Sequence, residues 1–188
     1  AKEARMAVHM DGARFANALA TLGCSPAELT WRAGVDMMSF GATKNGAMMA
    51  EAVVDFRPAS MRPPHESLRR RRMRGGHLLS KMRFLSAQLL AYVDDGLWLR
   101  LAGQANAGAK HLSEGLAALP GVRLAHPVEA NEVFVYLPEA LADALAAAGI
   151  EFHRWPGEDG LVARMVVPHS VEMADIEHLL SVAAAATA

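Results

Sequence analysis

The sequence predicts an α/β domain that is followed by a smaller α+β domain. Two observations lead to this expectation. In the first half, short apolar runs alternate with segments of helical spacing, as in residues 5–10, 15–22 and 35–40. In the second half, four strand candidates and two helical segments follow the order β-β-α-β-β-α. We expect the first domain to cover residues 1–95 and the second to cover residues 96–188.

The first domain begins with a strand that leads into helices. The apolar run 5–10 ends at Asp11 and Gly12, a pair that favours the end of a strand. Residues 15–22 have helical spacing and stop at a glycine. The next segment, "SPAE", has the pattern of an N-cap serine, an N1 proline and a capping-box glutamate. A short helix is therefore expected after Ser25.

A strand at 35–40 and another in "AEAVVDF" complete the first domain's sheet. Strand, helix and strand in this order predict a mainly parallel sheet, with its ligand side at the carboxyl ends of the strands. The segment "RPASMRPPHES" contains three prolines and is typical of a linker. Two long helical regions are expected after it, at about 66–92 and 97–119.

The elements of the second domain follow from short apolar segments and helical spacing. The strand candidates are "VRLAHP", "NEVFVYLP", "IEFHRW" and "LVARMVVP". "EALADALAAAG" is expected to form a helix between the second and third of them, and residues 173–186 are expected to form a closing helix.

Composition and charge limit the classes of function. With 188 residues and 52% hydrophobic content, the chain can bury a core. A net charge of -1 argues against polyanion binding as the main role. The single cysteine, Cys24, indicates a reducing compartment, and no apolar run approaches the roughly 20 residues of a membrane span. We therefore expect a cytoplasmic protein that binds neither nucleic acid nor membrane, and the histidine spacing predicts no metal site.

Lys44 and Asp11 are the residues with the clearest chemical potential. Lys44 lies in the loop "GATKNG" after a buried strand, and an amine kept from water there would be a nucleophile toward an aldehyde. A loop lysine alone is usually a solvated surface residue. Asp11 ends a strand that we expect to lie nearby. A carboxylate that faces a pyridine nitrogen and a lysine that can form an imine are what a pyridoxal phosphate site requires.

At these residues the sequence resembles a known family. "HMDGAR" and "SFGATKNG" together are similar to the L-threonine aldolases of the aspartate-aminotransferase-like fold (fold type I), in particular the low-specificity bacterial branch. "GGHLLSKMRFLSAQLLAY" resembles the same branch, and the likeness runs from about Val8 to the C-terminus. The resemblance implies a pyridoxal-5'-phosphate-dependent lyase that cleaves L-threonine, L-allo-threonine and related β-hydroxy-α-amino acids to glycine and an aldehyde. It also implies that residues 1–95 are the C-terminal part of the cofactor-binding large domain.

The resemblance assigns roles to six residues. Asp11 would pair with the pyridine nitrogen, Arg14 would hydrogen-bond the phenolic oxygen of the ring, and Lys44 would carry the Schiff base. Arg164 would bind the substrate carboxylate, a task that suits a guanidinium. Family members bring basic residues from the region of "LRRRRMRGGHLLSK" to the cofactor phosphate of the neighbouring subunit, and the candidates here are Arg72 and Lys81.

The resemblance also concerns what lies outside the chain. Family members draw a ring-stacking histidine and the main phosphate-binding loop from a segment that would precede Ala1. We therefore expect a missing N-terminal half, a homodimer or homotetramer as the active form, and an inactive, poorly soluble product when residues 1–188 are made alone.

Two alternatives remain open. Another enzyme of the same fold type, either a β-eliminating lyase or an aminotransferase, would use the same cofactor, since a fold does not fix the reaction. A nucleic-acid-binding domain would use "RRRRMR" as a basic patch, but a near-zero net charge and the lack of interleaved aromatic residues weigh against it.

Overall fold

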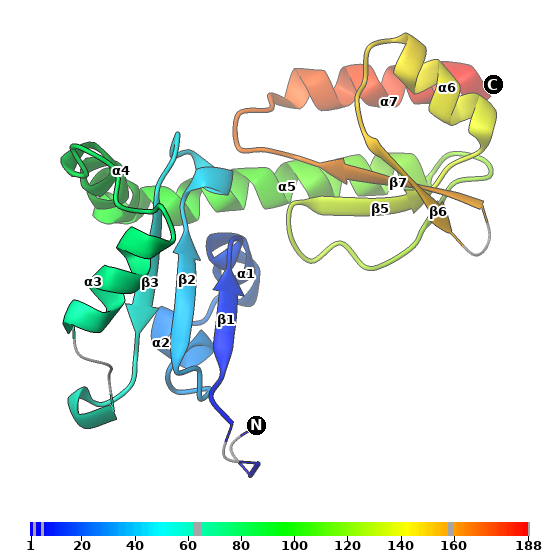
Figure 1. Cartoon of the computed structure of the whole chain (residues 1–188). Helices are drawn as coiled ribbons and strands as arrows, with labels where there is room; N and C mark the ends of the chain where they lie inside the picture. The colour runs from blue at the N-terminus through cyan, green and yellow to red at the C-terminus, as the bar shows by residue number, and fades with distance from the viewer. Residues whose placement is uncertain (2, 5, 62–64, 158–159, 188) are drawn as a thin grey trace. The chain divides into compact units, whose positions relative to one another are not determined.

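The computed structural model of the chain describes all residues except 2, 5, 62–64, 158–159 and 188. The chain divides into two compact units, Ala1–Trp98 and Leu99–Ala188 (Figure 1). Residue 5 of the first expected strand and residues 62–64 of the expected linker lie outside the described residues. The functional division into domains 1–95 and 96–188 stays a prediction.

The first unit is built on a mixed three-stranded sheet in the order β1-β2-β3. The strands are β1 (His9–Gly12), β2 (Met37–Gly41) and β3 (Glu51–Asp55). β1 and β2 are parallel, as expected, with Asp11 opposite Ser39. β3 is antiparallel to β2, which differs from the expected parallel direction. The connection over residues 42–50 is too short for the crossover of a dozen or more residues that a parallel strand requires.

One face of this sheet is covered by α1 (Phe15–Leu22). Phe15 and Leu19 pack with Met38 of β2, and the partly buried Met10 and Phe40 join this cluster. α1 ends at Gly23, whose left-handed φ of 62° lets its N–H bond to the carbonyl of Leu19 at 2.9 Å. The short helix α2 (Pro26–Leu29) follows with the complete capping box that the sequence predicted at Ser25.

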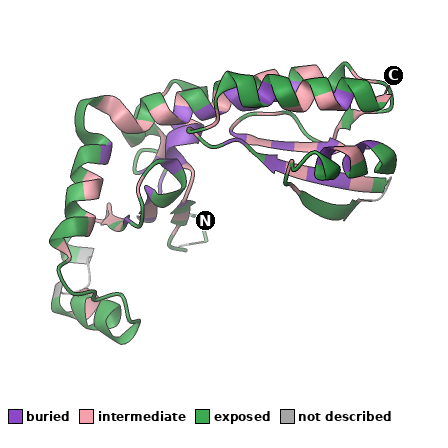
Figure 2. Ribbon diagram, turned by 90° about the horizontal axis from the view of Figure 1, so that it is seen from above, coloured by how far each residue is buried: buried purple, intermediate pink, exposed green. Residues whose placement is uncertain are grey.

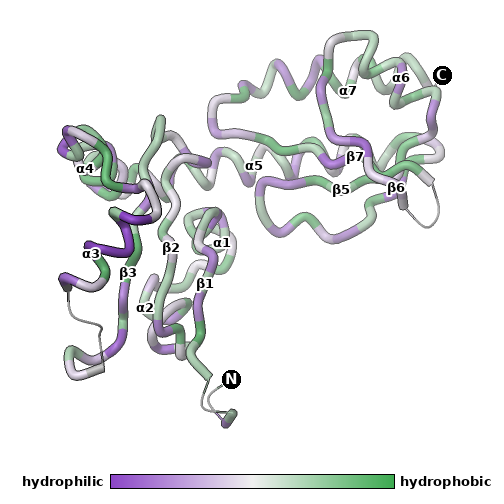
Figure 3. The backbone as a smooth tube through the Cα atoms, viewed as in Figure 1, coloured by the Kyte–Doolittle hydropathy of each residue, from purple (hydrophilic) through white to green (hydrophobic). Residues whose placement is uncertain are grey.

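The expected long helix over 66–92 is wrong, because the structure has two shorter helices there. These are α3 (His65–Arg74) and α4 (Arg83–Val93). Gly76 has a φ of +73°, a left-handed conformation that ends α3, and Lys81 also has a positive φ, of 55°. Five of the ten residues of α3 are arginines, so it is one of the most hydrophilic segments in Figure 3. The short helices η1 (Thr43–Asn45), η2 (Ala59–Met61) and η3 (Asp94–Gly96) lie in the connections.

The second unit begins within the long helix α5 (Leu97–Ala117) and has the expected β-β-α-β-β-α order. Its antiparallel sheet has the strand order β4-β5-β7-β6. The strands are β4 (Arg123–Leu124), β5 (Glu132–Tyr136), β6 (His153–Gly157) and β7 (Gly160–Val166), and the helices are α6 (Glu139–Ala147) and α7 (Met173–Thr187).

The core of this unit lies between its helices and the inner face of the sheet. Val133 and Val135 of β5 and Leu116 of α5 are inaccessible to solvent, and Leu141 and Leu145 of α6 pack in the same cluster. Figure 2 shows buried segments along the strands and helices. None of the described helices is both long and apolar enough to cross a membrane.

Candidate active site

Asp11 occupies the carboxyl end of β1, on the sheet face opposite α1. Its side chain is exposed, and its Oδ1 accepts a hydrogen bond from the backbone N–H of Ala13 at 3.0 Å. Ser39 lies beside it on β2, and the Ser39 hydroxyl is 3.3 Å from Nε2 of His9. The bond to Ala13 fixes the carboxylate while leaving Oδ2 for another partner, so Asp11 has the local role of a turn cap and can also bind a ligand.

Two glycines allow the ends of β1 and β2 to approach closely. A Cβ on Gly12 would stand 2.5 Å from the carbonyl oxygen of Ser39, and a Cβ on Gly41 would stand 2.9 Å from Cα of Ala13. Contacts this short with backbone atoms exclude a side chain at either position without a shift of the strands. The two strand ends therefore meet at one edge, where Asp11 and the connection after β2 both lie.

Lys44 lies in that connection, within η1 and three residues beyond the end of β2. Its side chain is exposed, so the described residues do not keep the amine from water, which differs from the expectation for this loop. Gly46 follows with a φ of 113°, a conformation that glycine adopts without strain and that closes the turn. Asp11 thus lies at the carboxyl end of β1, and Lys44 follows the carboxyl end of the adjacent parallel strand β2.

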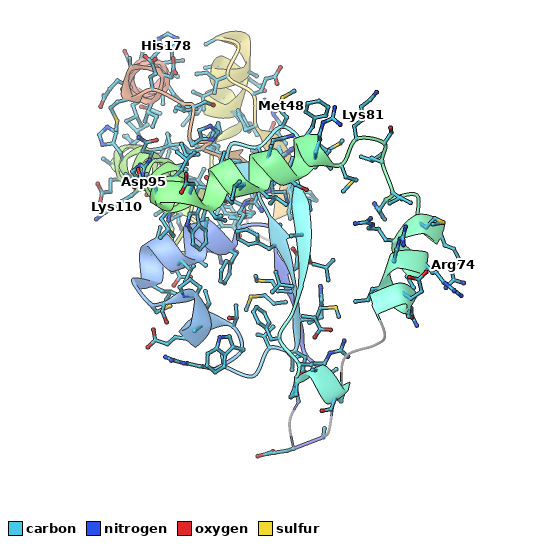
Figure 4. All side chains as sticks on the ribbon, turned by 90° about the vertical axis from the view of Figure 1, so that its left-hand side faces the viewer. Met48, Arg74, Lys81, Asp95, Lys110 and His178 are labelled. Carbon is cyan, nitrogen blue, oxygen red and sulfur yellow. The ribbon has the colours of Figure 1, made fainter. Side chains whose placement is uncertain are left out.

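The backbone of this connection is fixed at several points. The backbone N–H of Ala50 donates to the Thr43 hydroxyl at 3.1 Å, and Ala42 and Ala50 are buried. The Oε1 of Gln88 on α4 accepts hydrogen bonds from the backbone N–H groups of Met48 and Met49, at 2.9 and 3.2 Å. Met48, which is labelled in Figure 4, lies on this connection and is exposed.

The other cofactor-binding candidates lie on different elements of the first unit. Arg14 is half-buried at the residue before α1, next to the turn that holds Asp11. Arg72 lies on α3 and Lys81 lies between α3 and α4, and both are exposed. Figure 4 shows Lys81 just before α4 and Arg74 at the end of α3. No described contact joins Arg72 or Lys81 to the edge with Asp11, so their role stays a prediction.

Arg164 lies in the second unit, on the outer face of β7. It is paired with Phe134 of β5 and His153 of β6 in the strand register. Its Nε donates to Oε1 of Glu132 at 2.9 Å, and its Nη2 forms an ion pair with the same oxygen. Arg164 and Glu132 are both mostly buried, so this pair fixes one edge of the guanidinium.

The surroundings of Arg164 are aromatic and partly open to solvent. Phe134 packs edge-on against Trp155, with 6.2 Å between ring centroids, and Trp155 is 53% exposed. A shallow surface pocket is lined by Arg164 together with Phe152 and His153. This arrangement suits a small ligand that has both a carboxylate and an uncharged part.

Sequence reasoning missed two residues that contact the candidates or their loop. Glu132 is the partner of Arg164, but the two are separated by 32 positions, and only the strand register brings them together. Asn45, directly after Lys44, is a buried polar residue that hydrogen-bonds Tyr92. A polar residue among small loop residues gives no sign of burial in a sequence. Among the residues that the structure describes, no group of three or more histidine, cysteine or acidic side chains could hold a metal ion.

Comparison with known proteins places these residues in a family. A family model described as beta-eliminating lyase matches residues 1–140, a range that contains Asp11, Arg14 and Lys44. The chain belongs to the beta-eliminating lyase family. Within this family, the resemblance to L-threonine aldolases that the motifs indicated is confirmed by named relatives.

Two curated relatives are named low specificity L-threonine aldolase. The one from a Pseudomonas species is 46% identical over 178 residues, which are 95% of this chain and 50% of the relative. The one from Pseudomonas aeruginosa is 49% identical over 159 residues, which are 85% of this chain and 45% of the relative. The chain therefore spans about half the length of the curated relatives it matches.

A solved structure supports the same family membership. The Leishmania major threonine aldolase matches with a TM-score of 0.82 at 28% identity, over 100% of this chain and 54% of that chain. The fold expectation is therefore confirmed: the described chain has the α/β fold of the fold-type-I enzymes.

Proposed function

We propose that this chain is part of a pyridoxal-5'-phosphate-dependent lyase that cleaves L-threonine, L-allo-threonine and related β-hydroxy-α-amino acids to glycine and an aldehyde. The observation that carries the proposal is the placement of Asp11 at the carboxyl end of β1 and of Lys44 just after the carboxyl end of the adjacent parallel strand β2. The names of the two Pseudomonas relatives and of the Leishmania major structure support the same activity.

The residues at this edge fit the cofactor. Asp11 presents a fixed and exposed carboxylate, and Lys44 presents an exposed amine on an anchored loop. The strand ends beside them approach too closely at Gly12 and Gly41 for side chains. When bound, pyridoxal phosphate supplies an electron-accepting ring beside the substrate's α-carbon.

Each cofactor-binding residue of this chain has a distinct task in the proposal. Lys44 would hold the cofactor through its amine. Asp11 keeps a proton on the ring nitrogen, because a nearby carboxylate stabilises the charged form of a base. Arg14 donates to the phenolic oxygen. Arg72 and Lys81 neutralise the cofactor phosphate of a neighbouring subunit, since guanidinium and ammonium groups bind phosphate strongly.

Arg164 binds the substrate carboxylate in the proposed enzyme. Its Nε and one Nη2 hydrogen are used by Glu132, so a carboxylate would bind through Nη1 and the remaining Nη2 hydrogen. This contact would hold the carboxylate end of the amino acid in one orientation. Proton removal from the β-hydroxyl is assigned to no residue of this chain.

The proposal extends to the assembly. The curated relatives are about twice the length of this chain, so we infer that the activity needs the remaining length as well. We also infer that the active form is a homodimer or homotetramer, in which subunits share the phosphate contacts.

The decisive experiment is borohydride reduction of the full-length protein with pyridoxal phosphate bound, followed by peptide mapping. We expect the pyridoxyl label on Lys44, and we expect Lys44→Ala to abolish both the label and turnover. Asp11→Asn should keep the fold and lose most of the activity, because an unprotonated ring withdraws electrons poorly. A label on Lys81 or Lys110 instead would show that Lys44 is not the attachment residue.

A β-eliminating reaction is the second candidate, and the description of the matched family favours it. Product analysis of the same protein separates the two reactions. Glycine and an aldehyde from L-threonine support aldol cleavage, whereas ammonia and a 2-oxo acid support β-elimination.

A further inference from the structure

Asn45 is 3% exposed, although it directly follows the exposed Lys44 in η1. The two neighbouring side chains therefore have opposite environments, one open to solvent and the other enclosed. An enclosed amide is costly unless its polar atoms are hydrogen-bonded. The contacts of Asn45 thus bear directly on where the backbone of Lys44 is held.

Both hydrogens of the Asn45 amide have partners. Nδ2 donates to the hydroxyl of Tyr92 at 2.7 Å and to the backbone carbonyl of Trp98 at 2.8 Å. Tyr92 lies on α4 and Trp98 near the start of α5. Asn45 therefore joins the turn that carries Lys44 to two different helices.

The partners of Asn45 belong to a packed aromatic cluster. The ring centroid of Phe40 is 5.8 Å from that of Tyr92 and 5.7 Å from that of Trp98. Tyr92 is 3% exposed, and burial raises its pKa, although the hydrogen bond from Asn45 opposes this shift. Because Phe40 lies on β2, the cluster fixes the turn relative to the strand that precedes it.

The remaining bonds of the connection are of a different kind. The backbone N–H of Asn45 bonds to the carbonyl of Ala42 at 3.0 Å, and Thr43 bonds to Ala50, so these contacts close the connection on itself. Gln88 joins α4 to Met48 and Met49, but these residues lie beyond Gly46. Asn45 makes its contact to the helices immediately beside Lys44.

We propose that Asn45 is a positioning residue, which holds the Lys44 backbone through Tyr92 and Trp98 and so aims the lysine amine at the cofactor. This inference rests on the proposed role of Lys44. Misplacement of a reacting group by 1 Å can reduce a rate by about 10²-fold. Since a lysine side chain is long and flexible, its aim depends on a fixed backbone.

The test uses the full-length protein with pyridoxal phosphate bound and two variants that remove the contact in different ways. Asn45→Ala removes both bonds, and Tyr92→Phe removes one hydroxyl while it keeps the ring. We expect Asn45→Ala to lower kcat by about 10- to 100-fold with little change in KM, and Tyr92→Phe to have a smaller effect. In the double variant the two losses should not add, because both variants remove the bond between Asn45 and Tyr92.

Two further readouts separate positioning from general stability. Asn45→Ala should shift the pH titration of the visible absorbance of the lysine-bound cofactor. In the cofactor-free protein, it should also speed amide hydrogen exchange in residues 42–50. The matched control is Asn131→Ala, because Asn131 is equally buried and donates to the carbonyl of Val167 in the second unit. It should lower the unfolding midpoint without changing kcat, the titration or the exchange of residues 42–50.

The possible outcomes are distinct. If Asn45→Ala matches Asn131→Ala in kcat and in the titration, Asn45 is only structural and the inference is wrong. If Asn45→Ala does not fold, an unchanged kcat and titration in Tyr92→Phe would equally overturn it. If Lys44→Ala keeps the lysine-type absorbance, the proposed role of Lys44 fails, whatever the result at position 45.

Discussion

The substitution Gly12→Ala tests the close approach of β1 and β2 beside Asp11. The added Cβ would stand 2.5 Å from the carbonyl oxygen of Ser39 and 3.1 Å from the side chain of Met38. The methionine can move at low cost, but the carbonyl belongs to the neighbouring strand. To reach ordinary van der Waals distance, the strands must separate by roughly 1 Å, which would break hydrogen bonds of normal length.

The magnitude follows from these two effects. Overpacking of a well-packed site costs about 1–3 kcal/mol, and each lost backbone hydrogen bond adds about 1 kcal/mol. We expect Gly12→Ala to lower the free energy of unfolding by about 3 kcal/mol. It should also weaken cofactor binding, because Asp11 moves with β1.

Gly103→Ala is the matched control. Gly103 lies within α5, and a Cβ there would meet nothing within 4 Å. Alanine in a helix is more favourable than glycine by about 0.5–1 kcal/mol, so this variant should be slightly stabilised. The assay is urea denaturation of both variants, with hydrogen exchange of residues 9–12 to localise the effect. Equal stability of Gly12→Ala and the unmodified protein would refute the close approach of the two strands.

Two other predictions concern Arg164 and Tyr92. Arg164→Ala should raise KM for L-threonine by about 10- to 100-fold in the full-length enzyme, which corresponds to the free energy of a lost charge-assisted hydrogen bond. The visible absorbance of the cofactor should stay unchanged. An unchanged KM would contradict a carboxylate-binding role. Burial raises the pKa of Tyr92 above its ordinary value near 10, so the folded state keeps the phenol proton at a pH where the unfolded state loses it. The contribution of the protonated Tyr92 to the free energy of unfolding is fully present below about pH 10 and is lost as the pH rises through the folded-state pKa. Tyr92→Phe should therefore flatten the decline of the free energy of unfolding at alkaline pH, measured by denaturation. An identical decline in the variant and in the unmodified protein would contradict the raised pKa of Tyr92.

Local signals in the sequence predicted local structure well. The capping box at Ser25 is present because its two hydrogen bonds form between residues three positions apart, as in any helix of that pattern. The stop of α1 at Gly23 and the order of elements in the second unit were also predicted correctly. In each case the deciding interactions lie within a few residues of the chain.

The failures involve competition between local signals or contacts between distant residues. The arginine-rich helix stops at Gly75 and Gly76, although the surrounding residues have helical spacing. The antiparallel direction of β3 depends on the length of its connection, which the strand pattern itself does not encode. The pairing of Arg164 with Glu132 depends on the register of β5 and β7, so it needed the assembled sheet.

The roles at the site came from a combination of motifs. Asp11 and Lys44 are unremarkable individually, and the sequence could associate them only through the expectation of neighbouring strands. The parallel register of β1 and β2 supports that association. The roles of Asp11, Lys44, Arg164 and the other three candidates all stay predictions, because their proposed partners are groups outside this chain.

The arrangement of the three strands has a consequence for the kinetics of folding. β2 and β3 pair across residues 42–50, whereas β1 pairs with residues 28 positions further along the chain. Closing the longer loop costs more entropy, and contacts between nearby residues form sooner. We therefore expect the hairpin that carries Lys44 to form early and β1 to join it late. During synthesis β1 emerges before β2 and remains without this partner strand until β2 follows, so the Asp11 carboxylate and the Lys44 amine come together only when the two strands pair.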